Sequence, residues 1–382
     1  MQHYLDHHAT TPLAQEVELA MAPLWRHGFG NPASVEHSRG LAAADRIDTA
    51  RGQVAQALGA EAREVVFTSG ATEANNMAVL GAARFRRRHE NRDHVIVFAA
   101  EHSCVLGAAR ALGDEGFRIT ELPITSEGFA DLDALAEALS DRTALVCLML
   151  ANNEVGTLQP MRAVTELAHA AGAWVHSDAA QAVGKVPVDV RALDVDLLSL
   201  SGHKLYGPMG VGALFVRRRP RVRLEPLVHG GGQERGFRAG TLPLPLIVGL
   251  GEAVALTQRS LASEAQAHSA LRDTLLSELA DSAIPFVING SMKQRLPGNV
   301  SLSFPTLSRD TLFAALADAG VAASSGSACS SHDVAPSHVL TAMGVPAQLA
   351  QQTLRIGLGR GSSLADIRAL LSALSSASQR AV

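Results

Sequence analysis

Cysteines and aromatic residues are both scarce in this chain of 382 residues. Only Cys104, Cys147 and Cys329 occur, and so low and odd a number argues against a disulfide framework and indicates a reducing compartment. The spacing of cysteines and histidines is not typical of a metal site, so we expect no bound metal. Aromatic residues make up only 4% of the chain. Aliphatic packing must therefore provide most of the stability of the core.

Excess charge and long apolar runs are lacking as well. The formal net charge is −4, which provides no electrostatic footprint for nucleic acid or an anionic membrane surface. No apolar segment is long enough to cross a bilayer. The segment from Met1 to Thr11 lacks the basic and apolar regions of a secretory signal. We therefore expect a soluble, cytoplasmic protein without nucleic-acid or membrane partners.

Hydrophobic residues are plentiful by comparison, at 47% of the sequence, which is enough for a full-sized core. A chain of 382 residues exceeds the usual size of a single core, so we expect two domains. From Val65 to Val216, short apolar runs alternate with helical patterns. This alternation predicts an α/β fold with a mostly parallel sheet covered by helices on both faces.

The pattern changes in the C-terminal third of the chain. Residues 246–279 have the spacing of one long helix, and short predicted strands and helices follow it. We predict a large domain over residues 15–250 and a smaller α+β domain formed by residues 1–14 and 251–382. The N-terminal arm has a polar, turn-like sequence and is expected to fold back onto the smaller domain.

One stretch combines predicted strands with a lysine in an unusual place. The apolar run 195–200 predicts a buried strand that ends at a Ser-Gly turn, and residues 212–216 predict the returning strand. His203 and Lys204 lie on the short connection between them. A partly buried lysine beside another cation shifts toward its neutral form, which is a nucleophile for carbonyl groups. The alternative is an exposed lysine on a surface hairpin.

Four small residues, Ser69-Gly70-Ala71-Thr72, separate a predicted strand from a predicted helix. Backbone N–H groups at the start of a helix favour a phosphate, and the Thr72 hydroxyl would add a donor. The same pattern occurs at plain helix caps, so both interpretations stay open. No Walker loop or dinucleotide fingerprint is present.

Polar side chains also follow other predicted strands, and ligands of such sheets bind beyond the carboxyl ends of the strands. Asp178 could hold a protonated ring nitrogen of a cofactor or cap a helix. His102 could act as a general acid or base or be a turn residue. Near the C-terminus, Arg355 could clamp a carboxylate through two hydrogen bonds or form a surface ion pair.

The three cysteines differ in their surroundings. Cys104 and Cys147 fit the pattern of buried, inert thiols. Cys329 lies among Ser and Gly residues, where a thiol could become a thiolate nucleophile. Taken together, the candidates describe an aldehyde cofactor with a phosphate, a partner for its ring nitrogen, a lysine that forms a Schiff base, a carboxylate clamp and a thiol.

A series of short motifs extends from Tyr4 to about Arg360. They are Tyr4-Leu5-Asp6 with Ala9-Thr10-Thr11-Pro12, Gly30-Asn31-Pro32, Thr68 to Glu73, Glu101-His102, Asn152 to Gly156, Asp178 to Gln181, Ser201 to Lys204, Gly230 to Gly236, and Ser324 to Cys329. In these motifs the chain resembles the cysteine desulfurases, which are pyridoxal-phosphate enzymes with the fold of class V aminotransferases. The resemblance implies a fold type I transferase.

The resemblance also implies an activity. A cysteine desulfurase removes sulfur from L-cysteine, which leaves L-alanine and a persulfide on the enzyme, here on Cys329. The persulfide would pass to a sulfur acceptor such as an iron–sulfur scaffold protein. The alternatives are a selenocysteine lyase, another class V transaminase or lyase, and a non-catalytic subunit that kept the fold.

Site residues carry over motif by motif. In catalysis, Lys204 would form the Schiff base and move the substrate's α-proton, His102 would stack on the ring and shuttle protons, and Cys329 would attack the substrate sulfur. The residues that would bind pyridoxal 5'-phosphate are Ala71, Thr72, Asn153, Asp178, Gln181, Ser201, His203, Lys204 and Thr241.

Several of these residues have a more specific implied role. Asp178 would pair with the ring nitrogen and Gln181 with the phenolic oxygen. Asn153 and Arg355 would bind the substrate carboxylate. Thr241 would reach the cofactor of the partner subunit in a homodimer. The catalytic cysteine would lie on a mobile loop over residues of about 324–338.

The chain departs from the family pattern in two places. Family members usually carry Asn and then Ala after the aspartate of the first motif, whereas this chain has His7-His8. Relatives in the housekeeping pathway often have a longer C-terminus that docks a scaffold, whereas this sequence ends at Val382. Transfer of sulfur to tRNA thiolation, to DNA sulfur modification or to a specialised cluster pathway therefore stays open.

Overall fold

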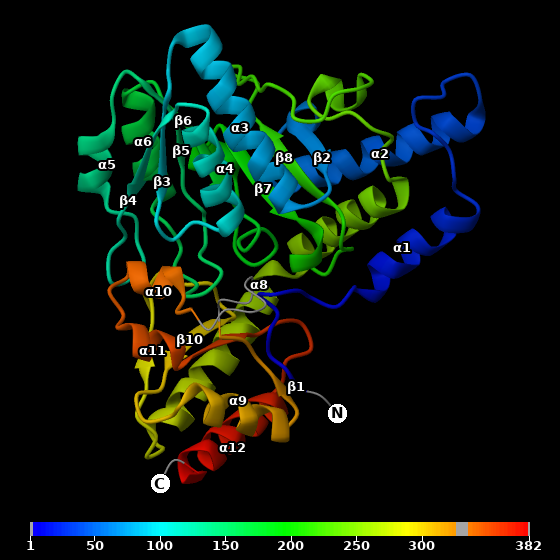
Figure 1. The fold of residues 1–382 in the computed structure, drawn as a ribbon. Coiled ribbons are helices and arrows are strands. Elements are labelled where there is room, and N and C mark those ends of the chain that lie inside the picture. Colours follow the sequence, from blue (N-terminus) through cyan, green and yellow to red (C-terminus); the bar gives the residue numbers. More distant parts are fainter. Residues whose placement is uncertain (1–2, 326–334, 381–382) are drawn as a thin grey trace.

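The computed structural model describes residues 3–325 and 335–380. Within these ranges the strands form a seven-stranded sheet, a three-stranded sheet and a two-stranded pairing. Figure 1 shows the large sheet with helices packed on both faces, and below it a smaller body that contains both ends of the chain.

The seven-stranded sheet has the order β2 (Val65–Thr68), β8 (Gly212–Val216), β7 (Leu197–Ser201), β6 (Trp174–Asp178), β5 (Thr143–Cys147), β3 (His94–Phe98) and β4 (Arg118–Leu122). Strands β3 to β7 pair in parallel, and β8 runs antiparallel to both of its neighbours. The predicted mostly parallel sheet is confirmed, and so is the return strand after the lysine turn. The central strands are buried along their whole length because helices cover both faces.

Two hydrophobic cores lie on opposite faces of this sheet. Phe67 and Ile96 belong to one core, whereas their strand neighbours Val66 and Val95 belong to the other. This alternation follows from the two-residue repeat of a strand. The surrounding helices are α1 (Gln15–Arg26), α2 (Ser38–Ala57), α3 (Ala71–Glu90), α4 (Ser103–Asp114), α5 (Leu132–Ala138), α6 (Met161–Ala170) and α7 (Val190–Leu193).

The smaller body contains the sheet β12 (Thr353–Gly357), β10 (Asn299–Ser303) and β9 (Val287–Ile288), in that order and antiparallel. Its helices are α9 (Arg309–Asp318), α10 (His338–Ala342), α11 (Ala347–Gln351) and α12 (Leu364–Arg380). Most of these elements enclose a third core, which includes Leu302, Leu312, Ile356 and Leu370.

One helix joins the two bodies. The predicted long helix is confirmed as α8 (Leu244–Ala280). Leu250 and Val254, near its start, pack in the core of the large sheet, whereas Leu275 and Leu279, near its end, pack in the third core. The helix crosses residue 250 without a break, and the proposed domain boundary at that position stays a prediction.

The N-terminal arm was predicted to be turn-like, and for its first described residues this is wrong. Strand β1 (His3–Tyr4) pairs in parallel with β11 (Val321–Ala322), and Leu5 is buried in the third core. Two polar residues carry no strand pattern of their own, and their pairing partner lies more than 300 positions away.

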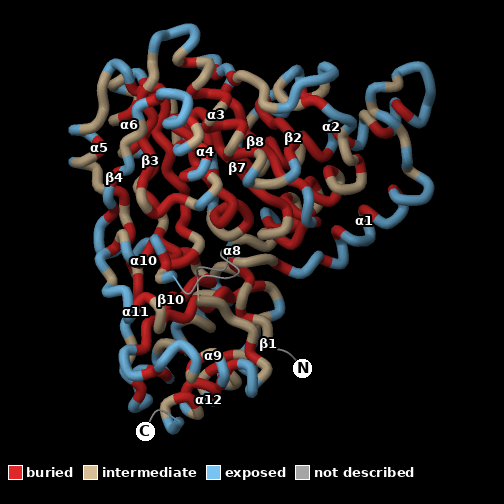
Figure 2. The backbone as a smooth tube through the Cα atoms, viewed as in Figure 1, coloured by how far each residue is buried: buried red, intermediate tan, exposed pale blue. Residues whose placement is uncertain are grey.

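Figure 2 shows the buried strands of the large sheet in contrast with the exposed loop that links α1 and α2.

Among the helices that the structure describes, none combines the length and apolar character needed to traverse a bilayer. Over the same residues, no group of three or more His, Cys, Asp or Glu side chains is arranged to hold a metal ion.

Candidate active site

A pocket of about 590 Å³ opens where several strands of the large sheet end. It is lined by the turn after β2, the segment after β3, the ends of β6 and β7, and Ala9 and Thr10 of the N-terminal arm. Seven of the predicted catalytic and cofactor-binding residues line it together: Ala71, Thr72, His102, Asp178, Ser201, His203 and Lys204. Strand ends far apart in the chain thus meet at one edge of the sheet, as expected for a parallel sheet.

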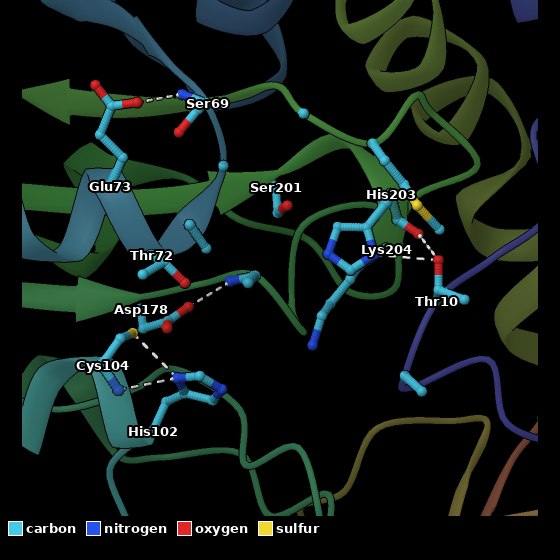
Figure 3. Close-up of a pocket in the computed structure, with 16 residues that line it drawn as sticks. Thr10, Ser69, Thr72, Glu73, His102, Cys104, Asp178, Ser201, His203 and Lys204 are labelled. Atoms are coloured by element: carbon cyan, nitrogen blue, oxygen red, sulfur yellow. Dashed lines mark hydrogen bonds between the residues drawn. The ribbon is translucent and has the colours of Figure 1, made fainter. Parts of the chain in front are cut away.

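Lys204 closes a short 3-10 turn, Gly202–Lys204, directly after β7. The turn is held by backbone N–H groups of Leu205 and Gly207, which both donate to the Gly202 carbonyl, at 3.1 and 3.0 Å. Lys204 is half-buried, and Figure 3 shows its side chain extending into the open centre of the pocket, toward the side where Asp178 and His102 lie. The amine is therefore placed where a ligand in the pocket would meet it.

The N-terminal arm clamps this turn from outside the sheet. The backbone N–H and the hydroxyl of Thr11 both donate to the His203 carbonyl, at 2.8 and 2.9 Å. The same hydroxyl accepts from the Tyr206 N–H at 2.8 Å, and Tyr206 has a φ of +64°. One side chain thus holds the residues on both sides of Lys204. The sequence showed the Thr10-Thr11-Pro12 motif but assigned it no contact.

The side chain of His203 is also fixed at the pocket wall. Its Nδ1 lies 3.1 Å from the Thr10 hydroxyl. Burial, followed by the charges of Lys204 and Lys185, lowers the pKa of His203 to about 4. The imidazole is therefore neutral near pH 7 and can act as a hydrogen-bond donor or acceptor.

The start of α3 forms one end of the pocket. Gly70 precedes the helix with a φ of 150°, a backbone conformation that favours glycine, and no side chain caps the helix. The first backbone N–H groups of this 20-residue helix are therefore available to an anion. Thr72 and Ser201 add hydroxyl groups to the same pocket. Of the two interpretations of this turn, the geometry favours a phosphate cradle over a plain side-chain cap.

Asp178 lies at the end of β6 with both carboxylate oxygens engaged. Its Oδ1 accepts from the Ala180 N–H at 2.9 Å, and its Oδ2 accepts from Asn75 Nδ2 at 2.6 Å. The residue is 8% exposed and that small opening faces the pocket. Asn75, a buried residue of α3, is a site residue that the sequence analysis missed, because an isolated asparagine inside a helix has no motif around it.

His102 combines the two roles considered from its sequence position. It is the N-cap of α4, since its Nδ1 accepts from the Cys104 N–H at 3.2 Å, and it also lines the pocket. Burial, and to a lesser degree the Lys204 charge, lowers the pKa of His102, although the Asp178 charge opposes this. Because Nδ1 accepts a backbone hydrogen bond, the proton of the neutral ring is on Nε2.

Cys104 was expected to be a buried, inert thiol. The structure corrects the expected burial, because Cys104 is only partly buried. It packs against the second core but also lines the pocket, with Sγ 3.0 Å from His102 Nδ1. Burial and the Asp178 charge raise the pKa of the thiol to about 11, so it remains protonated near pH 7. Cys147 is fully buried in β5, as predicted.

Four predicted residues lie outside the lining of this pocket: Asn153, Gln181, Thr241 and Arg355. Arg355 is buried, so its alternative interpretation as a surface ion pair is wrong. Its Nη2 pairs with Asp6 at 2.8 Å and its Nη1 donates to the Asn153 carbonyl at 3.2 Å. Thr241 is exposed. Cys329 lies outside the described residues, and the roles assigned to all these residues stay predictions.

The sequence as a whole matches a known family. The model of the family described as aminotransferase class-V matches residues 3–370. The chain belongs to the aminotransferase class-V family. The resemblance inferred from the motifs is thereby confirmed, over the whole length that the motifs cover.

Individual class V relatives make the similarity more specific. "Cysteine desulfurase IscS" of Rickettsia bellii is 46% identical over 94% of this chain and 86% of its own length. Among solved structures, one titled "NIFS-LIKE PROTEIN" is 35% identical, with a TM-score of 0.90 over 98% of this chain and 99% of that one. Another, titled "SspA in complex with cysteine", is 37% identical, with a TM-score of 0.83 over 94% of this chain and 99% of that one. The expected fold type I architecture is in line with these neighbours.

Proposed function

We propose that this class V protein is a pyridoxal-phosphate-dependent cysteine desulfurase. The observation that carries the proposal is a single pocket in which Lys204 lies opposite Asp178, with the uncapped start of α3 at one end. These are the three groups that an aldehyde cofactor with a ring nitrogen and a phosphate requires. The relatives named cysteine desulfurase and the neighbour solved with cysteine support the choice of substrate.

The donor set fits this cofactor. The N–H groups of Ala71 and Thr72, with the hydroxyls of Thr72 and Ser201 and the His203 ring, would hold the phosphate. Asp178 would hold the ring nitrogen in its protonated form. Pyridoxal phosphate supplies an electron sink, which withdraws electrons from the bonds at the substrate's Cα and Cβ.

The chain's own groups would then bind cysteine and move its protons. Arg355 and Asn153, which contact each other, would bind the substrate carboxylate. Lys204 would take the proton from Cα and return it. His102, whose Nε2–H is turned away from its helix cap, would donate or accept a proton on the other side of the pocket.

Cys329 would take the sulfur. Its thiolate would attack the substrate sulfur, so that a sulfur–sulfur bond forms, the Cβ–sulfur bond breaks, and alanine leaves. The described residues on either side of the stretch that contains Cys329 support this role. Ser324 exchanges two backbone hydrogen bonds with Arg355, at 2.6 and 3.3 Å, and His338 Nε2 lies 2.9 Å from the Glu101 carbonyl, next to His102. The persulfide would pass to an iron–sulfur scaffold or another sulfur acceptor, and we place the protein in the cytoplasm.

A homodimer would complete the site. Large apolar side chains of the N-terminal region are exposed, among them Trp25, Phe29 and Val35 at about 60%. Met209, at the rim of the pocket, is 64% exposed. Thr241 lies outside the pocket of its own chain, which supports the proposal that it contributes to the partner's cofactor site. Gel filtration with light scattering would measure the mass directly.

The proposed activity is tested by sulfide and alanine release from L-cysteine in the presence of a thiol reductant. Cys329→Ala should abolish sulfide release while the protein keeps its cofactor. Cys147→Ala, which removes a buried thiol that does not line the pocket, is the matched control and should stay active. Undiminished release by Cys329→Ala would reject the desulfurase mechanism and favour another class V lyase. Parallel assays with selenocysteine would separate a desulfurase from a selenocysteine lyase.

A further inference from the structure

The amide of Gln181, which follows the pocket-lining Ala180 in the chain, is held by two residues that the proposed function has not used. Its Oε1 accepts from Lys185 Nζ at 2.7 Å and lies 3.0 Å from His8 Nδ1. Its Nε2 donates to the His8 carbonyl at 2.8 Å. His8 is 1% exposed and Gln181 is 4% exposed, so water cannot substitute freely for these partners.

These contacts determine which way the amide faces. A backbone carbonyl can only accept, so the amide group beside the His8 carbonyl must be the NH₂. The Oε1 atom can only accept as well, so the proton of the His8 ring must be on Nδ1. Burial, followed by the charges of Lys185, Arg355 and Lys204, holds the pKa of His8 well below its usual value, so the ring is neutral. One N–H of Gln181 is then left for another acceptor.

The remaining ring nitrogen of His8, Nε2, is buried and has no hydrogen-bond partner among the described residues, and His8 lines a small cavity. His8, Lys185 and His268 line a small cavity of about 20 Å³, together with Tyr206 and Glu264. A cavity of this size has room for one water molecule. A water there could donate to Nε2 and would help to keep the His8 proton on Nδ1.

We infer that His8 and Lys185 are positioning residues, which hold the Gln181 amide so that its unused N–H donates to the phenolic oxygen of the bound cofactor. This inference rests on the proposed function only through the cofactor, not through the sulfur chemistry. His8 stands where the family resemblance leads one to expect alanine, so this half of the arrangement departs from the usual family pattern. A donor at the phenolic oxygen stabilises its negative charge.

The inference is tested by titrating the visible absorption band of the holoenzyme with pH. His8→Ala and Lys185→Met should each raise the pH midpoint of this band by about one unit. The phenolic oxygen of the cofactor would lose part of the hydrogen bonding that stabilises its negative charge, so the bound cofactor would keep its proton to higher pH. Gln181→Ala should raise it at least as much. The double variant His8→Ala/Gln181→Ala should shift no further than Gln181→Ala alone, since His8 acts through that amide.

His7→Asn is the matched control. His7 is a buried imidazole of the same arm, but its ring packs edge-on against Tyr4, with centroids 4.9 Å apart. The pH midpoint of the absorption band in His7→Asn should equal that of the wild type. If His8→Ala fails to fold, Lys185→Met is compared with Lys185→Met/Gln181→Ala, which should shift no further than Gln181→Ala alone, because Lys185 also acts on Lys204 directly through its charge.

Two results would overturn the inference: a wild-type midpoint in both His8→Ala and Lys185→Met, or a His8→Ala shift that persists when Gln181 is already alanine. Holoenzyme that shows the expected shifts but releases no sulfide from cysteine would contradict the proposed function and still support this inference. A protein that takes up no cofactor would sink both.

Discussion

Asn75 donates a hydrogen bond from Nδ2 to Asp178 Oδ2 over 2.6 Å. The two residues are 103 positions apart, one on α3 and the other at the end of β6. Because the Ala180 N–H engages the other carboxylate oxygen, the group is held in one orientation at the edge of the pocket. The helix whose first turn would bind the phosphate thus also orients the carboxylate that would bind the ring nitrogen.

Asn75→Ala should weaken cofactor binding by about 10-fold or more, because a hydrogen bond to a charged group contributes roughly 1.5–3 kcal/mol. The affinity can be measured by titrating the cofactor-free protein with pyridoxal phosphate. Asn76→Ala is the control, since that neighbouring amide bonds the Thr72 carbonyl within its own helix. Equal affinities for the two variants would show that Asn75 does not orient Asp178.

Lys204→Ala should be colourless or should lose its cofactor readily, because no other predicted residue forms the Schiff base. Wild-type protein should be yellow and bleached by borohydride. Lys293→Ala, which changes an exposed lysine, should behave as wild type. A yellow, borohydride-sensitive Lys204→Ala variant would contradict the assignment, and a colourless wild type would favour a non-catalytic subunit.

Thr11→Val should destabilise the lysine turn. The substitution leaves the Tyr206 N–H without its acceptor and removes one of three donors to the His203 carbonyl, which should lower stability by about 1–3 kcal/mol. Thr11→Ser keeps the hydroxyl and should be close to wild type. Thermal unfolding of the three proteins, without and with cofactor, measures the effect. Identical midpoints for valine and serine would argue against the clamp.

Glu101 should make the protein less stable as pH rises. Met149 N–H donates to its Oε1, its Oε2 is buried without a partner, and burial with the Asp178 charge raises its pKa to about 8. Between a pH of about 4.5 and 8, the folded state keeps this proton while the unfolded state loses it. Stability then falls with pH, by at most about 1.4 kcal/mol per unit.

Glu101→Gln removes this proton difference and keeps an oxygen for the Met149 N–H. The variant should therefore lose less stability than the wild type between pH 5 and pH 8, as measured by urea unfolding across that range. Glu127→Gln changes an exposed glutamate and should follow the wild-type curve. Parallel curves for Glu101→Gln and wild type would mean that Glu101 ionises normally in the fold.

Arg355→Lys should raise the KM for cysteine by roughly 10-fold or more, with a smaller effect on kcat, because lysine cannot present two parallel donors to a carboxylate. Arg360→Lys alters the next arginine, which pairs with Glu264 away from the predicted substrate site, and should leave KM near the wild-type value. A larger effect of Arg360→Lys than of Arg355→Lys would place the carboxylate elsewhere.

Much of the framework of the site was predictable from local patterns. The buried strand, the Ser-Gly turn, Lys204 and the return strand follow from an apolar run, a glycine and a second apolar run, and the structure has them in these places. The long α8 was predicted to within two residues at each end. These features depend on neighbours within a few positions, so the sequence displays them directly.

The contacts that orient the site were not predictable in this way. Thr11 meets His203 and Tyr206 across more than 190 positions, and β1 pairs with a strand at the other end of the chain. His8 reaches Gln181 across 173 positions. The short helices α7 and α10 were missed because four or five residues carry too little periodicity.

The sequence by itself determined the alternation of strands and helices around the large sheet, the family and the identities of the chemical groups at the strand ends. The tertiary structure alone decided which of those groups share a pocket, which lie behind it, and which partner orients each one. The physical reason is that periodicity and turn chemistry act over a few residues. A hydrogen bond between distant residues, in contrast, exists only after the sheet and its cores have brought both of them to the same place.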